Sequence, residues 1–344
     1  MYLQARIERI VLGYTVDKKP FTVKDLGIAE AITVLLKDAL LPNLVQTTEQ
    51  TTAFVHGGPF ANIAHGCNTV LATKMAMSTS DYVVTESGFG SDLGAEKFLD
   101  IKCRLSGLRP SATVIVVTSA ALKLHGGVPA TDINKPNMEA LIAGIPNLQR
   151  HVHNMKNFGQ SVIVSFNKFK YDTPEEIDFL THFCETEGVV FAINNGFAKG
   201  GEGAADLAQK VVNVVENNPS KDINFTYDLE DHIKTKIEKI ATKIYRAGEV
   251  VYNGGAFAKL KQFKDNGWDK LPVCIAKTQY SFSDDEKKIN APEGFTINIR
   301  DLVINAGAGF IVAVAGEIMR MPGLPKDPQA MHIKLVDGNI EGLS

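Results

Sequence analysis

At 344 residues the chain is about twice the length of a common domain, which predicts two or three domains. Hydrophobic residues make up 44% and charged residues 22% of the sequence, which fits a soluble globular protein and excludes the disordered, collagen-like and coiled-coil classes. The 36 lysines and arginines against 39 aspartates and glutamates give a net charge of -3, without the positive excess typical of nucleic-acid binding. We therefore expect no nucleic-acid partner.

The four cysteines lie far apart and form no CxxC pair: they are Cys67, Cys103, Cys184 and Cys274. This spacing favours neither a disulfide framework nor a zinc ribbon, and a reducing cytoplasm is the expected location. Charged residues at positions 6, 8 and 9 interrupt the N-terminus where a signal peptide has its apolar core. No apolar run approaches the ~18 residues of a membrane-spanning helix, so no membrane partner is expected.

Short runs rich in β-branched residues alternate along the chain with helix-like segments. Helices are predicted at residues 23–40, 138–155, 204–215 and 231–246, and a further helix is expected to begin at Pro174. Strands are predicted at residues 81–86, 112–118, 161–166, 189–193 and 271–276. The alternation predicts an α/β fold with a parallel sheet covered by helices, followed from about residue 226 by a smaller C-terminal α+β domain.

Three loops are predicted to follow strands, at residues 87–92, 167–172 and 194–203. Each carries aromatic side chains, which are Phe89 in the first loop, Phe169 and Tyr171 in the second and Phe197 in the third. If the loops share one edge of one sheet, these rings would flank a flat heteroaromatic ligand. The alternative is that the rings pack into loop–helix cores, and the residue pattern leaves both interpretations open.

Glycines in the first and third loops would let backbone N–H groups approach an anion. However, the sequence contains no GxxxxGK[ST] phosphate loop. The GGEG at residues 200–203 lacks the following Lys and Ser/Thr, and the GFG at residues 88–90 is too short for a dinucleotide fingerprint. A phosphate cradle of the usual type is therefore absent from the sequence.

Residues 52–68 form the most unusual stretch of the chain. His56 precedes two glycines and a proline, and His65 lies two residues before Cys67. A zinc site from these three residues lacks a fourth ligand, and a nucleophilic Cys67 lacks a third, orienting group. We favour a buried, hydrogen-bonded turn near a ligand, with a purely structural histidine as the alternative at His65.

Several motifs together, in chain order, resemble those of the formate–tetrahydrofolate ligase family. They are AFVHGGPFANIAHGCN at residues 53–68, DYVVTESGFGSDLGAEKFL at 81–99, KLHGG at 123–127, FAKGGEG at 197–203, KTQYSFSDDE at 277–286 and MPGLPK at 321–326. The resemblance runs from near Arg6 to the C-terminus. It therefore covers essentially the whole chain.

The resemblance implies an ATP-dependent ligase with Mg²⁺, in which formate is activated as formyl phosphate and tetrahydrofolate takes up the formyl group. It also implies α/β layers of the P-loop-NTPase-like or Rossmann-like kind, a homo-oligomer and a monovalent cation, with no metal held by the residues of this chain. Family members carry the phosphate loop and the cation ligands in an N-terminal half, so this chain resembles the C-terminal portion and would need such a half as partner. A non-catalytic folate-binding or scaffold protein is the alternative.

By motif matching, the resemblance places the pterin ring of folate between Phe169 and Phe197, with Ile193 alongside. Phe89 and Gly90 would lie near the formyl group, and His56 and Asp92 are the candidates for accepting a proton. The family commonly has Trp at position 197 and Pro at position 170, where this chain has Phe197 and Lys170. A phenyl ring offers less stacking area than an indole, which predicts weaker folate binding.

The resemblance also suggests a division into three domains. Residues 1–105 would be the remainder of a nucleotide-binding domain, residues 106–225 an α/β folate-facing domain and residues 226–344 the C-terminal domain. Without an N-terminal half, residues 1–45 are expected to expose an apolar patch.

Overall fold

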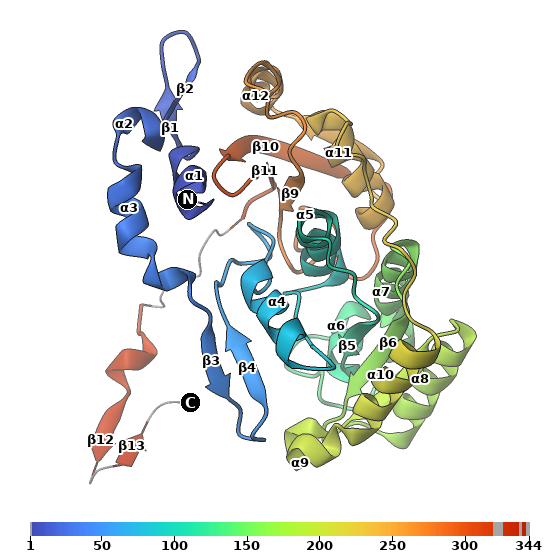
Figure 1. The fold of residues 1–344 in the computed structure, drawn as a ribbon. Helices are drawn as coiled ribbons and strands as arrows, with labels where there is room; N and C mark the ends of the chain where they lie inside the picture. Colours follow the sequence, from blue (N-terminus) through green and yellow to red (C-terminus); the bar gives the residue numbers. More distant parts are fainter. Residues whose placement is uncertain (1, 319–325, 337–338, 342–344) are drawn as a thin grey trace.

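A computed structural model describes residues 2–318, 326–336 and 339–341 and shows an α/β protein (Figure 1). The α-helices are α1 (Tyr2–Glu8), α2 (Val23–Leu26), α3 (Ala29–Leu36), α4 (Val70–Thr79), α5 (Arg104–Ser106), α6 (Ser119–His125), α7 (Met138–Asn157), α8 (Pro174–Thr186), α9 (Gly196–Gly203), α10 (Ala205–Asn217), α11 (Ile233–Ile240) and α12 (Gly254–Asp265). The π-helical segments are η2 (Ser91–Ala95), η3 (Phe98–Cys103) and η4 (Ala241–Tyr245), and the 3₁₀ turns are η1 (Asp38–Leu40) and η5 (Gln329–Met331). The strands are β1 (Val11–Tyr14), β2 (Pro20–Thr22), β3 (Asn43–Gln46), β4 (Thr52–Val55), β5 (Thr113–Val117), β6 (Val162–Asn167), β7 (Val190–Asn194), β8 (Glu249–Tyr252), β9 (Val273–Ala276), β10 (Thr296–Asn305), β11 (Phe310–Ala315), β12 (Lys334–Val336) and β13 (Asn339–Glu341). The MPGLP sequence at residues 321–325 lies outside the described residues.

A parallel sheet with the order β5-β6-β7 confirms the strands predicted at 112–118, 161–166 and 189–193. Its central strand β6 is buried from Val162 to Phe166, as a strand covered on both faces should be. Because β6 and β7 are parallel neighbours, their carboxyl ends lie at the same edge of the sheet.

A second sheet has the order β8-β10-β11-β9. The β10–β11 pair is an antiparallel hairpin, and β8 and β9 run parallel to their neighbours on the two outer sides. Strand β9 confirms the prediction at 271–276, and all of β9 and β11 is buried. One hydrophobic core joins this sheet to the parallel one, since Phe166 of β6, Val152 of α7, Ile237 of α11 and Ile311 of β11 belong to the same buried cluster.

Most predicted helices are confirmed. Helix α11 and η4 together bury the isoleucine stripe Ile233, Ile237, Ile240 and Ile244. Helix α8 begins at Pro174 because Thr173 and Glu176 form a reciprocal capping box at its first turn. The helix predicted over residues 23–40 is wrong in its continuity, because Gly27 adopts a left-handed conformation (φ 75°) and ends α2.

The strand predicted at residues 81–86 is also wrong. These residues form no strand, and Val84 in their middle is 91% exposed. A β-branched run becomes a strand only where a neighbouring strand accepts its backbone hydrogen bonds. Among the described residues, no strand pairs with residues 81–86, and their sequence alone does not reveal this.

The N-terminal segment, which we define as residues 2–55, lies along one side of the molecule (Figure 1). Its helix α1 is fixed to the β10–β11 turn because Arg6 donates to the carbonyls of Gly307 (2.9 Å) and Ala308 (2.7 Å). Much of the rest is exposed, and Leu35 and Leu41 have exposed fractions of 82% and 67%. The apolar patch predicted within residues 1–45 is therefore confirmed. Within the described residues, no helix has the length and apolar character needed to cross a bilayer.

Candidate functional site

An aromatic cluster lies at the carboxyl edge of the parallel sheet. Phe169 follows β6 and Phe197 follows β7, and their ring centroids are 5.4 Å apart at an angle of 48°. Tyr171 stacks on Phe169 with centroids 5.6 Å apart and nearly parallel planes. Phe197 is 87% exposed, so the cluster has an open apolar face at the position where parallel sheets bind ligands.

Short polar bonds hold the two loops of this cluster together. Asn194 Nδ2 donates to Asn167 Oδ1 (3.1 Å) across the ends of β7 and β6, and Asn194 Oδ1 accepts from the N–H of Gly196 (2.9 Å). In the loop that follows β6, the N–H of Phe169 donates to Asp172 Oδ2 (2.6 Å). The paired asparagines thus fix where Phe169 and Phe197 leave the sheet.

The Phe169–Phe197 pair is closed in this structure. A flat ring inserted between two others needs the outer rings about 7 Å apart, because each stacked layer takes about 3.5 Å. The observed 5.4 Å leaves no such gap. Phe197 is the ring that has room to move, since it is exposed and sits in α9, whose regular geometry is broken at Gly200.

The loop of residues 87–92 packs tightly against the turn of residues 56–68. The N–H of Gly88 donates to the carbonyl of Gly66 (3.1 Å). A Cβ at Gly94 would lie 1.9 Å from the carbonyl oxygen of Gly88, so only glycine fits there. Phe89 projects from this loop with a left-handed backbone (φ 64°) and is 50% exposed.

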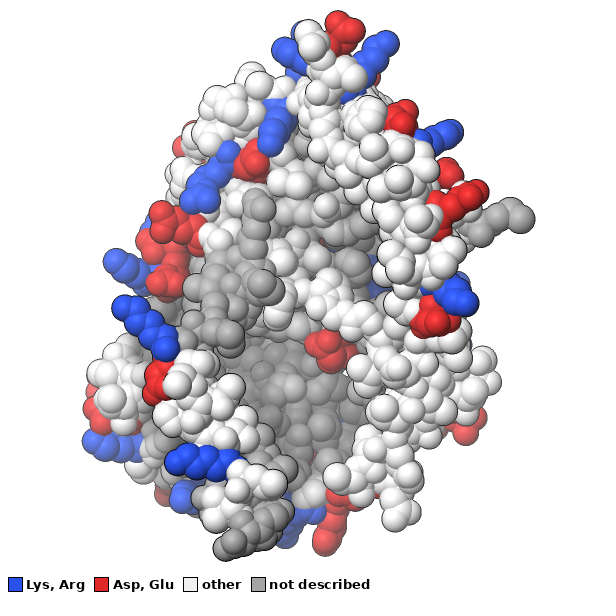
Figure 2. Space-filling view, turned by 90° about the vertical axis from the view of Figure 1, so that its left-hand side faces the viewer, with Lys and Arg blue, Asp and Glu red and all other residues white. Residues whose placement is uncertain are grey.

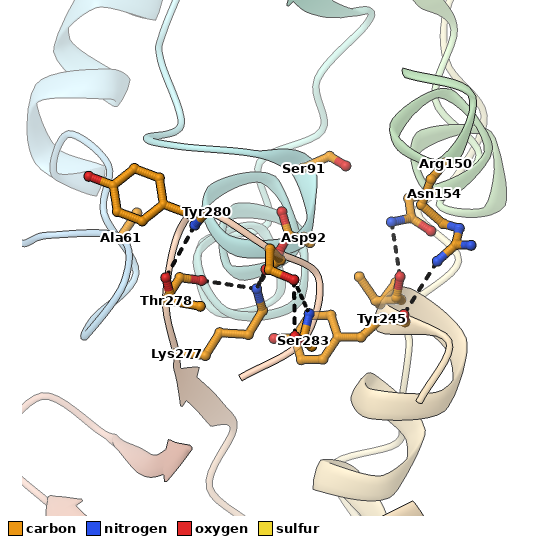
Figure 3. A network of polar contacts seen from close by, with 12 residues as sticks. Ala61, Ser91, Asp92, Arg150, Asn154, Tyr245, Lys277, Thr278, Tyr280 and Ser283 are labelled. Carbon is orange, nitrogen blue, oxygen red and sulfur yellow. Dashed lines mark hydrogen bonds and ion pairs between the residues drawn. The ribbon is translucent and has the colours of Figure 1, made fainter. Parts of the chain in front are cut away.

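Two buried lysines, Lys97 and Lys277, tie three of the motif segments together, and the surroundings of Lys277 are shown in Figure 3. Lys277, directly after β9, forms an ion pair with Asp92 Oδ2 at 2.7 Å and donates to the carbonyls of Thr278 (3.1 Å) and Ser281. Lys97, between η2 and η3, donates to the carbonyl of Ala61. Burial lowers the pKa of Lys277, and the adjacent Asp92 carboxylate opposes that shift.

A histidine supports the same loop from α7. Ser91 Oγ and His151 Nδ1 are 2.5 Å apart, and a Cβ at Gly90 would lie 3.0 Å from His151 Cε1. Desolvation lowers the pKa of His151 to about 4, so the ring is neutral at pH 7. A neutral imidazole carries a proton on one ring nitrogen and accepts a hydrogen bond at the other. In the tautomer with an unprotonated Nδ1, the Ser91 hydroxyl donates its hydrogen bond to that nitrogen.

Two carboxyl groups lie behind Asp92 on the same helical segment, Glu96 and Asp100. Both are fully buried, and burial raises the pKa of each, with the neighbouring Asp100 as the second cause at Glu96. Asp100 accepts from the N–H of Thr226 (2.9 Å) and pairs with Arg104 (3.2 Å). Glu96 has neither contact with the described residues, and burial raises its pKa well above the usual value.

His56 is held at both ring nitrogens. Nε2 is 2.8 Å from the carbonyl oxygen of Ala39, and Nδ1 is 2.8 Å from Thr69 Oγ1. Because a carbonyl only accepts, Nε2 carries the proton and Nδ1 accepts from the threonine hydroxyl. The backbone N–H of His56 also donates to Asn68 Oδ1 (3.1 Å). His56 therefore bridges the turn and η1, and proton acceptance at Nδ1 requires the Thr69 bond to break.

The structure thus brings together two of the three predicted ligand loops. The loops 167–172 and 194–203 share one sheet edge. Ile193 is the next-to-last residue of β7 and precedes Phe197 in the chain. The loop 87–92 follows no strand, so the expectation that all three leave one sheet is wrong. Sequence reasoning did not single out Lys97, Lys277 or His151. The sequence carried one signal for Lys277. This lysine directly follows an entirely apolar strand, and a cation buried there needs a polar or charged partner.

Among the residues that the structure describes, no group of three or more His, Cys, Asp or Glu side chains is placed to hold a metal ion. The sequence has no phosphate loop, so none of its residues is assigned to ATP or Mg²⁺.

The fold and the aromatic edge define an α/β protein of the kind that binds its ligand at the carboxyl ends of parallel strands. The family model described as formate–tetrahydrofolate ligase matches residues 1–344. The chain therefore belongs to the formate–tetrahydrofolate ligase family, which the sequence motifs predicted.

Curated relatives agree with this assignment. A protein named formate–tetrahydrofolate ligase from Bacteroides fragilis is 63% identical over 342 residues, and those from Bacteroides thetaiotaomicron and Campylobacter concisus are 60% and 54% identical. Each alignment covers 99% of this chain but only 62% of the relative. The chain thus spans less than two thirds of the length of the relatives it matches.

Proposed function

We propose that this chain forms the folate-facing part of a formate–tetrahydrofolate ligase. The reaction converts ATP, formate and tetrahydrofolate into 10-formyltetrahydrofolate, ADP and phosphate through formyl phosphate. Family membership over the whole chain supports the reaction class. The observation that carries the folate-facing role is the exposed aromatic pair Phe169 and Phe197 at the edge of the sheet, although its two rings are closed on each other in this structure.

In this proposal the pterin ring enters between Phe169 and Phe197 after Phe197 swings outward, and Ile193 lies beside it. Phe169 stays in place because Tyr171 stacks on its ring. The loop carrying Phe89 and Gly90 would face the formyl group. The Lys277–Asp92 ion pair holds the position of this loop.

His56 and Asp92 remain the proposed groups for handling protons. Asp92 is 5% exposed and already paired with Lys277, and both His56 nitrogens are engaged. Each would act only after one of these contacts opens. The Asn variant at position 92 and the Gln variant at position 56 test the two roles in the activity assay described below.

A partner supplying the ATP site is part of the proposal. The chain exposes 19152 Å², whereas a compact monomer of 37.4 kDa exposes about 13,700 Å². Among the described residues of the face that carries the N-terminal segment, charged side chains lie mostly around the margins (Figure 2). We propose that an N-terminal ATP-binding half, as a separate chain or in a longer one, covers this surface and holds ATP, Mg²⁺ and the monovalent cation.

The predicted domains also remain proposals, with residues 1–105 completing a nucleotide-binding domain, 106–225 facing folate and 226–344 forming the C-terminal domain. A cytoplasmic location is proposed from the scattered cysteines, and a homo-oligomer is proposed on the resemblance alone.

Calorimetric titration with tetrahydrofolate tests the folate-facing role. Phe197→Ala should weaken binding about tenfold, because one aromatic stack contributes about 0.5–1.5 kcal/mol beyond its buried area. Phe197→Trp should bind at least as tightly as the parent chain, since an indole offers more stacking area. The matched control is Phe257→Ala on α12, where Phe257 is 61% exposed and far from the aromatic pair in sequence. Equal affinity of the parent chain and Phe197→Ala would contradict the proposal.

Mixing the chain with the N-terminal portion of the Bacteroides fragilis relative tests the activity. We expect 10-formyltetrahydrofolate to form in the mixture and not with either part alone. Robust turnover by this chain alone would contradict the need for a partner. Folate binding without activity in any mixture would instead favour the non-catalytic alternative.

A further inference from the structure

A polar cleft separate from the aromatic pair lies between α7, the end of η4 and the loop before β10. Its volume is about 620 Å³, in the range of small-molecule sites. It is lined by Pro146, Gln149, Arg150, His153, Thr242, Arg246, Ala247, Ala291, Glu293 and Gly294. None of these residues belongs to the candidate folate or formyl region.

Arg150 lines this cleft and makes one close polar contact there. Its side chain is 8% exposed, and its Nη2 lies 2.6 Å from Glu293 Oε1. Its contacts with the carbonyls of Tyr245, Pro292 and Ala291 are long, at 3.4–3.5 Å. The guanidinium is thus poised for an acidic oxygen, and at present Glu293 supplies it.

Glu293 itself is weakly held. Its side chain is 70% exposed, and the bond to Arg150 is its one ion pair with residues the structure describes. The exposed Glu293 carboxylate is readily hydrated, whereas the buried Arg150 needs an anionic partner in its place. A ligand oxyanion can then take its place.

Arg246 provides a second cation at the same cleft. It forms no side-chain hydrogen bond or ion pair with any described residue. Burial is the main cause that lowers the pKa of Arg150, and the nearby charge of Arg246 adds to it. The backbone of Arg246 is left-handed (φ 65°), a conformation that favours glycine at the end of a helix. An arginine here strains the backbone, and Arg246 lines the same cleft as Arg150 without a side-chain partner among the described residues.

We propose that this cleft binds a small oxyanion, a phosphate or carboxylate group, between Arg150 and Arg246 with displacement of Glu293. Two guanidinium groups converging on one cavity match the oxygens of such a group. His153 and Gln149 are both bound to Glu187 and leave the anion to the two arginines. This inference does not depend on the folate-facing function.

The test is calorimetric titration of the full chain with sodium phosphate and, in a second arm, sodium succinate, each at constant ionic strength. We expect saturable binding of one anion per chain. Arg246→Gly should weaken it about tenfold or more, because a charged hydrogen bond is lost. Glu293→Gln should tighten it by up to about fivefold, because a competing carboxylate is removed.

The variant Arg246→Gly distinguishes a loss of anion binding from a loss of folding. Glycine relieves the left-handed backbone at position 246, so its Tm should equal or exceed that of the parent chain. Arg109→Ala is the matched control, because Arg109 is an exposed arginine paired with Asp222 outside the cleft. Absence of saturable binding in both arms, or equal binding by Arg246→Gly, overturns the proposal. Binding of phosphate but not succinate, or the reverse, assigns the source of the oxyanion.

Discussion

At the residue scale, the candidate formyl region depends on a buried ion pair. Lys277 and Asp92 are 0% and 7% exposed in their side chains, and the pair joins the end of β9 to the first turn of η2. Taking two charges out of water is costly, and the attraction between them offsets that cost only while both are present. Removing one partner therefore leaves an uncompensated buried charge beneath the loop of Phe89.

Variants at this pair should show strong coupling. Lys277→Met and Asp92→Asn should each lower the free energy of unfolding by about 3–5 kcal/mol, and the double variant should lose less than the sum of the two. Urea denaturation measures all three. Lys210→Met is the control, because Lys210 pairs with Asp206 on the surface of α10 at 2.8 Å and should contribute below about 1 kcal/mol. Additive losses at Lys277 and Asp92 would show that the pair does not act as a unit.

At the element scale, the loop 87–92 and the helical segment after it form one close-packed unit. Gly94 in η2 lies against the backbone of Gly88, and Gly88 in turn bonds to Gly66. These contacts involve main-chain atoms, which cannot rotate out of the way as a flexible side chain does. Gly94 of the GFGSDLG sequence is therefore required for packing, before any contact with a ligand.

A single methyl group should reveal this packing. Gly94→Ala should destabilise the chain by at least about 2 kcal/mol, because the new Cβ would lie 1.9 Å from the carbonyl oxygen of Gly88. Gly58→Ala is the matched control in the neighbouring turn, where a Cβ would meet nothing within 4 Å, and should change stability by less than about 0.5 kcal/mol. Thermal and urea unfolding check both. Similar stability of the two variants would mean that the loop relaxes easily.

The sequence predicted elements well where the signal was local. The apolar run of β6, the isoleucine stripe of α11 and the capping box of α8 each depend on residues within one element. The strand expected at 81–86 failed because strand formation depends on a neighbour that local sequence does not reveal.

For the candidate site, the proximity of Phe169 and Phe197 could be predicted because both follow neighbouring parallel strands, whereas their role in ligand binding stays a prediction. Lys277 and Asp92, or Ser91 and His151, are far apart in the chain, and only the packing of α7 and β9 around η2 brings them together. The closed spacing of the aromatic pair was likewise invisible in the sequence.

At the scale of the whole molecule, the exposed surface exceeds that of a compact monomer of this mass by about 5,000 Å². A stable protein–protein interface of standard size takes only about 800 Å² from each partner. The N-terminal segment contributes much of the exposed apolar surface, and Val34, Leu35, Leu41 and Leu44 are each more than 60% exposed. Such a surface should drive association of the chain with itself.

Two charges placed on this segment should therefore reduce self-association. The double variant Leu35→Glu and Leu41→Glu should shift the chain toward monomer in light scattering after gel filtration, with the free energy of unfolding changed by less than about 1 kcal/mol, because both side chains are already exposed. It should also fail to bind the N-terminal portion of the relative if that portion covers the same face. Phe257→Glu on α12 is the control and should leave both association and binding unchanged, since Phe257 lies outside the N-terminal segment. A monodisperse parent monomer that binds no hydrophobic dye would contradict the argument, because the exposed surface would then be stable in water without a partner.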